Sequence, residues 1–249
     1  MKKFFLMIGA GMVMLANITC IYGQENSGKV NLSVDVATGF VWRGLSLNPA
    51  PVVQPSFTLA PGKLSIGAWA SVPFTPDEYQ EVDIFINYQF TPSLSLCLTD
   101  YFGYDWGWNP PSYFNYKREE TFHVFDLQLI YDGSGGFPVK TMISTIIAGD
   151  DLERDEWNED GKRKQRFSTY FELGYGNTTS KGVDWELFAG FVPMASDFYN
   201  VFGADVINLG LGLSKSFEIT PTYSLPLSVK FIVNPSMETV FLTAAITLF

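Results

Sequence analysis

Acidic residues separated by a single position are the feature of this sequence that most directly suggests chemistry. Glu81 with Asp83, and Asp184 with Glu186, each place two carboxylates two residues apart. On an extended strand, residues i and i+2 point to the same face, so each pair would present both carboxylates to one surface. Such a pair could activate water or line a water-filled passage. In the wall of a sheet we favour the second role.

The sequence has one histidine, His123, which begins a predicted strand beside a long loop. A lipid-cleaving enzyme would need a nucleophilic Ser within hydrogen-bond reach of this ring. No Ser lies near it on the same strand face, and it shares its parity with Phe125 and Leu127. We therefore interpret His123 as a residue at the rim of the sheet. We expect no catalysis, no zinc site and no other cofactor.

Two long loops carry distinctive compositions. The loop 104–116 is rich in aromatic residues, which could stack a sugar at the mouth of the molecule. The favoured alternative is that it packs on itself and extends an aromatic belt. The loop 149–165 is acidic and could attract divalent cations, but it lacks the ligand spacing of an EF-hand. We therefore favour a solvated acidic loop.

The elements that must position these residues are strands, because apolar and polar residues alternate along most of the chain. A period of two places one residue set on each face of a sheet. We predict about twelve strands, each near the 9–11 residues that a tilted strand needs to cross a bilayer. Their ranges are 29–43, 52–60, 64–72, 81–90, 94–103, 121–131, 138–148, 166–176, 183–192, 205–217, 225–233 and 239–249.

The connections between these strands alternate between short turns and longer loops, as in bacterial outer-membrane barrels. A secreted β-sandwich would explain the alternation of side chains equally well. It would not explain why 16% of the residues are aromatic and cluster at strand ends, where a barrel has its interfacial girdles. The predicted girdle residues are Phe40, Trp42, Tyr88, Phe90, Tyr131, Phe171, Tyr175, Trp185, Phe191 and Phe217. We therefore predict an all-β fold, a transmembrane antiparallel up-and-down β-barrel.

The N-terminal segment has the pattern of a secretion signal. Lys2 and Lys3 precede an apolar stretch that reaches Tyr22, and we expect cleavage after Gly23. We favour this over an uncleaved anchor or lipid attachment at Cys20. Residues 24–249 would then form one barrel domain, and the net charge of −10 would become −12 without the two lysines. So acidic a chain repels nucleic acid, so we expect no nucleic-acid partner.

A family resemblance supports the barrel. Ser33-Val34-Asp35, the run 39–46 (GFVWRGLS) and the run 51–55 (PVVQP) resemble the opening of the TorF-type porin family. The runs 67–71 (GAWAS) and 81–84 (EVDI) continue the resemblance in the same order, so that it covers roughly residues 33–90. The resemblance implies an outer-membrane barrel that conducts small solutes.

The polar parity of the strands predicts which residues line the lumen. They are Asp35, Arg43, Gln54, Trp69, Glu81, Asp83, Asp126, Arg166, Glu172, Asp184, Glu186 and Lys230. Their acidic excess could give a water-filled passage that favours neutral and cationic solutes. Alternatively, the carboxylates pair with Arg43, Arg166 and Lys230 and hold a narrow lumen together. Five inward aromatic residues could block much of the bore, namely Trp69, Phe85, Tyr101, Tyr170 and Phe188.

Our sequence-based hypothesis is an outer-membrane porin-like channel for small polar solutes, with a constriction where Arg43 meets Glu81 and Asp83. The first alternative is a non-conducting barrel that binds a partner or glycan through its outer loops. A barrel-embedded lipid-modifying enzyme is the third. The expected partners are outer-membrane lipid, small polar solutes and the barrel-assembly machinery, which would engage the final strand through Phe249.

Overall fold

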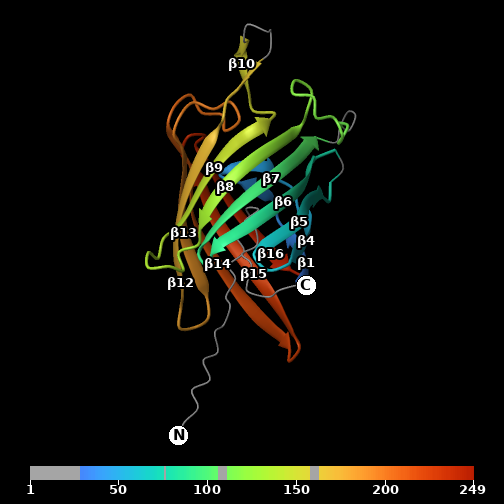
Figure 1. The fold of residues 1–249 in the computed structure, drawn as a ribbon. Coiled ribbons are helices and arrows are strands. Elements are labelled where there is room, and N and C mark those ends of the chain that lie inside the picture. Colours follow the sequence, from blue (N-terminus) through green and yellow to red (C-terminus); the bar gives the residue numbers. More distant parts are fainter. Residues whose placement is uncertain (1–28, 76, 106–110, 158–162) are drawn as a thin grey trace.

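Twelve antiparallel strands form a closed barrel (Figure 1). The structure is a computed structural model and describes residues 29–75, 77–105, 111–157 and 163–249. The signal peptide predicted for 1–23, the centre of the aromatic loop and part of the acidic loop lie outside the described residues. The wall strands are β1 (Lys29–Ala37), β4 (Val52–Ala60), β5 (Leu64–Pro73), β6 (Tyr79–Thr91), β7 (Leu94–Asp105), β8 (His123–Tyr131), β9 (Lys140–Gly149), β12 (Thr169–Thr178), β13 (Asp184–Val192), β14 (Asp205–Thr220), β15 (Tyr223–Asn234) and β16 (Thr239–Thr247).

Two small hairpins complete the described fold. β2 (Phe40–Trp42) pairs with β3 (Leu45–Asn48), and β10 (Leu152–Trp157) pairs with β11 (Arg163–Gln165). The prediction of about twelve wall strands is confirmed. The predicted first strand, 29–43, is wrong at its end, because β1 stops at Ala37 and the chain turns into β2. The hairpin of β10 and β11 within the acidic loop was not predicted.

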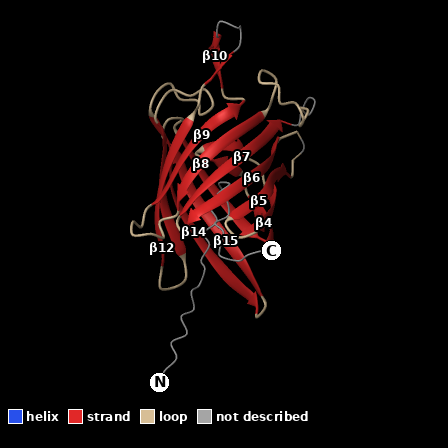
Figure 2. Cartoon of the chain, in the orientation of Figure 1, coloured by secondary structure: helices blue, strands red, loops and turns tan. Residues whose placement is uncertain are grey.

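Consecutive wall strands are neighbours in the barrel, so the connections fall alternately at its two ends. The turns at 61–63, 92–93, 179–183 and 221–222 share one end, which we call the turn end. The long segments 38–51, 111–122, 150–168 and 193–204 share the other, which we call the loop end (Figure 2). This is the alternation that the sequence predicted.

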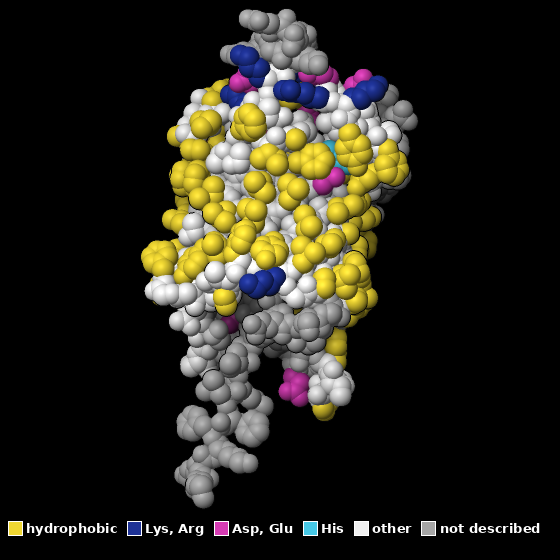
Figure 3. Space-filling model, in the orientation of Figure 1, with side chains coloured by type: hydrophobic (Ala, Val, Ile, Leu, Met, Phe, Trp, Pro, Cys, Tyr) yellow, Lys and Arg dark blue, Asp and Glu magenta, His cyan; other side chains and the backbone are white. Residues whose placement is uncertain are grey.

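The outside of the wall is apolar. Ile66, Ile86, Leu173, Leu187 and Leu211 are among the exposed large hydrophobic side chains on outward strand positions. In the space-filling view, hydrophobic side chains cover most of the face of the wall that is seen, and several Lys and Arg side chains gather near the loop end (Figure 3). Among the described residues, no helix is long and apolar enough to cross a membrane.

The predicted aromatic belt is correct in most positions. Tyr88, Phe90, Tyr175, Phe191 and Phe217 point outward and are exposed. Phe40 and Trp42 are the exceptions, since they are 2% and 5% exposed and belong to the hairpin of β2 and β3. That hairpin lies inside the barrel, where its Arg43 contacts Asp126 of β8.

The seam of the barrel joins β1 to β16. Its Cα partners are Asp35 with Thr247, Val36 with Ile246 and Ala37 with Ala245. On its other side β1 pairs with β4 along its whole length, from Lys29 to Ala37. The seam is therefore the shortest of the pairings that close the wall.

Candidate functional site

The hairpin Phe40–Asn48, which we call the plug hairpin, crosses the lumen near the loop end. It leaves the wall between β1 and β4, yet the Arg43 guanidinium at its tip contacts Asp126 on β8, almost diametrically opposite β1 in the strand order. The backbone carbonyl of Gly44 accepts a hydrogen bond from Asn234 of β15, with N and O 3.1 Å apart. The segment is therefore held by wall strands on different sides of the barrel.

Arg43 and Asp126 form a buried ion pair. Their charged atoms are 2.8 Å apart, and the two side chains are 2% and 0% exposed. The Asp126 carboxylate also accepts hydrogen bonds from Tyr101, Gln128 and Ser144. A buried charge is tolerated when it is paired and hydrogen-bonded, and Asp126 meets both conditions.

Aromatic rings hold the other faces of the Arg43 guanidinium. Its central carbon lies 4.4 Å from the ring centre of Trp42 and 4.8 Å from that of Tyr170. Arg43 also donates a short hydrogen bond to the hydroxyl of Tyr199. Ion pairing, hydrogen bonding and cation–π contacts thus fix one side chain from several sides.

The loop 193–204 is the second inward segment. Tyr199 and Val201 are buried, and the Tyr199 ring stacks on Trp42 with an interplanar angle of 10° and 5.8 Å between centres. Phe198 meets the edge of Trp42 at 5.9 Å. Trp42, Arg43, Tyr101, Tyr170 and Tyr199 together form a packed layer, in which each residue is at most 7% exposed. Because almost no solvent reaches these side chains, we infer that the layer occludes the lumen, and we call it the occluding layer.

The predicted constriction was wrong in two respects. Arg43 does not lie on the wall, and its partner is Asp126 rather than Glu81 or Asp83. The cause is the early end of β1, which moves Arg43 into the plug hairpin. Glu81 and Asp83 do point inward from β6 and are buried, and Glu81 accepts a short hydrogen bond from the hydroxyl of Tyr79.

Most other predicted lumen residues lie on the inner face of the wall. Gln54 donates to Ser71, Asp35 accepts from Thr247, and Trp69 packs against Phe40 of the plug hairpin.

The later wall strands also pair their inward polar groups. Glu172 accepts a hydrogen bond from Asn208, and Asp184 accepts one from Thr178 near the turn end. Glu186 pairs with Lys140 at 2.8 Å, and Lys230 is 7% exposed on β15. These contacts favour a wall whose inward polar groups pair with one another.

The prediction that Arg166 lines the lumen is also wrong. It lies between β11 and β12 at the loop end, where its guanidinium donates to the carbonyl of Ala195 and pairs with Asp197 at 3.6 Å. It is therefore a loop residue and not part of the lumen lining. The strand predicted for 166–176 begins at Thr169, because Phe167 has a φ of +57°, which ends the extended run.

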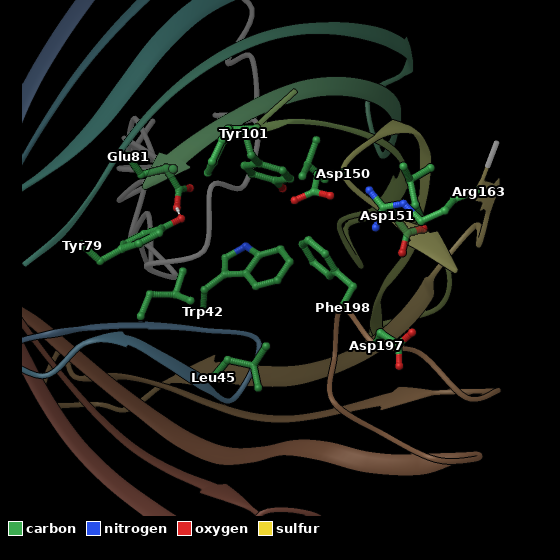
Figure 4. A pocket seen from close by; sticks show the side chains of 15 residues that line it. Trp42, Leu45, Tyr79, Glu81, Tyr101, Asp150, Asp151, Arg163, Asp197 and Phe198 are labelled. Carbon is green, nitrogen blue, oxygen red and sulfur yellow. Dashed lines mark hydrogen bonds between the residues drawn. The ribbon is translucent and has the colours of Figure 1, made fainter. Parts of the chain in front are cut away.

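A cavity of about 470 Å³ opens at the loop end above the plug hairpin, and we call it the mouth pocket. Its lining comes from the plug hairpin, from β6, β7 and β8, from the segment that holds β10 and β11, and from the inward loop 193–204. In Figure 4, Trp42 and Phe198 lie between two polar groups: Tyr79 and Glu81 on one side, and Asp151, Arg163 and Asp197 on the other. The full lining is Trp42, Leu45, Leu47, Tyr79, Glu81, Tyr101, Gly103, Phe122, Val124, Asp150, Asp151, Leu152, Arg163, Asp197 and Phe198.

Charged loop residues shape the rim of the mouth pocket. Asp151 is buried, and its carboxylate accepts hydrogen bonds from the backbone amide and the hydroxyl of Ser168, at 2.8 and 2.6 Å. Burial raises the pKa of Asp151, and the Ser168 hydrogen bonds oppose that shift. Arg163 pairs with Glu119 at 2.9 Å, and this contact lowers the pKa of Glu119.

His123 lies on the outward face of the wall, as its parity predicted. One ring nitrogen faces both carboxylate oxygens of Asp100, at 2.8 and 3.0 Å, and the other faces the carbonyl oxygen of Tyr113 at 2.6 Å. A ring protonated on both nitrogens would donate to both acceptors. The rings of Tyr113 and Tyr116 pack on His123, so the described part of the aromatic loop folds against the wall.

Sequence reasoning missed Tyr199 and the inward position of Trp42. Both lie outside wall strands, where a period of two carries no information on direction. Pro49 and Pro51 after the run 39–46, with Gly39 and Gly44 inside it, were a local signal that a turn interrupts the strand. Nothing local indicates that this turn folds into the lumen.

The closed twelve-stranded barrel with an apolar outer wall defines a protein of the outer-membrane β-barrel class. No family model and no curated protein matches the chain. Among solved structures, a match is Wzi of Escherichia coli, described as an outer-membrane protein involved in group 1 capsule assembly and a carbohydrate-binding β-barrel. It is 13% identical with a TM-score of 0.31, and the match covers 81% of this chain and 52% of that one. The matched part thus spans about half the length of Wzi.

Proposed function

We propose that the protein is an outer-membrane barrel that its own plug hairpin closes, and that it binds a ligand from outside in the mouth pocket. This is the alternative that the sequence left open beside a porin. The observation that carries the proposal is the seating of Arg43 between Asp126 and Tyr199 in the layer that occludes the lumen. A conducting porin needs water-filled space at every level of its lumen.

The setting of this proposal is the bacterial outer membrane. The apolar wall supports contact with outer-membrane lipid, and the long loops at the loop end would then face outward. We infer that Phe249, which follows β16, is the residue that the barrel-assembly machinery engages. The TorF-type resemblance stays a hypothesis, and the residues that carry it include the plug hairpin.

A gated channel for small polar solutes is the second candidate. It is favoured by the polar wall on the turn-end side of the occluding layer, where Asp35, Glu172, Glu186 and Lys230 point inward. Such a channel would conduct neutral or cationic solutes only after the plug hairpin had left its seat. It differs from an open porin in its resting state.

The pairing of β1 with β4 permits a clean test. Ala37 and Val52 are cross-strand partners, so residues 38–51 can be replaced by an Asn-Gly turn that joins the two strands directly. We expect the natural protein to show no steady current in planar bilayers, and the shortened protein to conduct. A matched control shortens the loop 111–120, which lies against the outside of the wall, and should stay closed.

Two results would contradict the proposal. One is a steady ohmic current through the natural protein equal to that of the shortened one. The other is a closed shortened protein that still folds into a heat-modifiable barrel, because the occlusion would then not come from the plug hairpin. Voltage-dependent opening of the natural protein alone would favour the gated channel.

A further inference from the structure

We propose that the mouth pocket is a binding site for a neutral or amino saccharide; this inference rests on the closed, ligand-binding barrel proposed above. Its volume of about 470 Å³ lies within the usual range of small-molecule sites, which is roughly 300–1,000 Å³. The plug hairpin forms part of the lining, so the pocket is reached from the loop end.

The walls of the pocket combine flat apolar surfaces with hydrogen-bond acceptors. Trp42, Tyr101 and Phe198 supply aromatic surface at its centre, and Glu81 lies at one side with the Tyr79 hydroxyl against it. A sugar ring has the matching structure, because its C–H faces are apolar and its rim carries hydroxyl donors. Aromatic side chains with a few fixed polar groups are the lining that orients such a ligand.

The charge of the pocket narrows the class of sugar. Glu81, Asp150, Asp151 and Asp197 are in the lining with one basic residue, Arg163. Arg163 is itself paired with Glu119, and Asp197 with Arg166, and both of these partners lie outside the pocket, so acids remain in excess when they are included. The local potential is therefore negative, and it disfavours phosphorylated or acidic saccharides while it admits neutral and amino sugars.

The aromatic loop, which the sequence suggested as a sugar platform, fits this role less well. Two of its described rings, Tyr113 and Tyr116, pack on His123 against the outside of the wall, and a third, Phe114, is 83% exposed. The mouth pocket offers enclosure, aromatic surface and acceptors together. A sugar site in the aromatic loop predicts that Phe114 is needed for binding, whereas a site in the mouth pocket predicts that it is not.

The test measures sugar binding to the full-length protein by calorimetry and saturation-transfer NMR. An amine-oxide detergent is required, because maltoside detergents carry a sugar headgroup. The probes are cellobiose, N,N′-diacetylchitobiose, glucosamine and glucose 6-phosphate. We expect binding of at least one neutral or amino sugar and none of the phosphate.

Variants of pocket and loop residues locate the sugar-binding site. Glu81→Gln and Phe198→Ala should each weaken binding about tenfold, the scale of one well-buried contact. Tyr79→Phe is a conservative third variant that removes the hydroxyl beside Glu81. The matched controls Glu120→Gln and Phe114→Leu change the same residue types in the outer loops and should bind like the natural protein. Heat modifiability shows that each variant is folded.

Three outcomes would overturn the inference: no sugar binds, glucose 6-phosphate binds equally well, or only Phe114→Leu loses binding. Each of these can occur while the bilayer currents still show a closed barrel, so they leave the proposed closure intact. An open resting channel would instead contradict the proposed closure. The sugar measurements would still show whether the mouth pocket binds a saccharide.

Discussion

Arg43 is a charged side chain that is almost fully buried, and its surroundings explain how the fold tolerates the buried charge. Asp126 neutralises the charge, Tyr199 accepts a hydrogen bond, and two aromatic rings face the guanidinium plane. Removal of one partner from a buried pair leaves an uncompensated charge, whereas replacement of both does not. The stability of the occluding layer therefore depends on the pair as a unit.

The first prediction concerns this pair. Arg43→Met and Asp126→Asn should each lower the free energy of unfolding by about 3–5 kcal/mol, and the double variant by clearly less than the sum. Urea unfolding in lipid vesicles measures the three values. The control is Lys117→Met, which breaks an exposed pair with Glu120 and should cost less than about 1 kcal/mol. Additive effects of the two buried changes would contradict the coupling.

The second prediction concerns pH at Asp151. Because burial raises its folded pKa above the ordinary 3.8, the folded loop binds this proton more tightly than the unfolded loop. The contribution of Asp151 to loop stability is therefore most favourable below pH 3.8, and it declines as pH rises through the folded pKa. Hydrogen-exchange protection of the Ser168 amide should fall over this interval in the natural protein.

Asp151→Asn is the control for that pH dependence. The amide keeps an oxygen that accepts from Ser168 but carries no charge, so the protection should vary much less with pH. Protection that rises with pH in the natural protein would show that the carboxylate is stabilised and not destabilised by its surroundings.

At the scale of elements, the wall and the plug hairpin differ in how far sequence predicts them. The alternation of apolar and polar residues is local, so it predicted β4 at its observed bounds and nearly every other wall strand within a few residues. The plug hairpin depends on contacts with Asp126 and Tyr199, which are 83 and 156 positions from Arg43. Glycines and prolines between Thr38 and Pro51 do indicate a turn, but no local residue indicates that the chain then folds into the lumen.

The inward parity of single residues was also predictable, because it follows from the strands. Glu172, Glu186 and Lys230 are buried on the inner face as expected. Their pairing was not predictable, since it depends on the stagger between strands and on the segments that enter the lumen. Arg166 shows the limit, because a shift of three residues in the start of β12 moved it from wall to loop.

The third prediction tests the seat of the plug hairpin. Gly44 has a φ of +79°, and a β-carbon there would lie 1.8 Å from the carbonyl oxygen of Ile207 on β14. Gly44→Ala should therefore unseat the tip of the hairpin and give a bilayer current while the wall stays folded. Gly62→Ala is the matched control, since Gly62 has a φ of +73° with no atom nearby, and its variant should remain closed.

At the scale of the whole molecule, an apolar outer wall encloses an interior that holds the buried charges, which is the arrangement of a barrel in a bilayer. The fourth prediction follows. Leu211 lies on the outward face near the middle of β14 with Leu187 and Phe231 as neighbours, so Leu211→Lys should cost about 2–4 kcal/mol in lipid. Thr222→Lys, in the turn after the same strand, should be nearly neutral. Equal effects in denaturant titrations would argue against burial of the wall in lipid.

The short seam between β1 and β16 has a kinetic consequence. Asp35 and Thr247, which are 212 positions apart, meet there, so ring closure joins almost the most distant parts of the described wall. Until these strands meet, the sheet has two unpaired edges that can pair with another chain. Contacts of such long sequence separation form slowly. We therefore expect closure of this seam to limit the folding rate, and mutations at Val36 or Ile246 to slow folding more than comparable changes elsewhere in the wall.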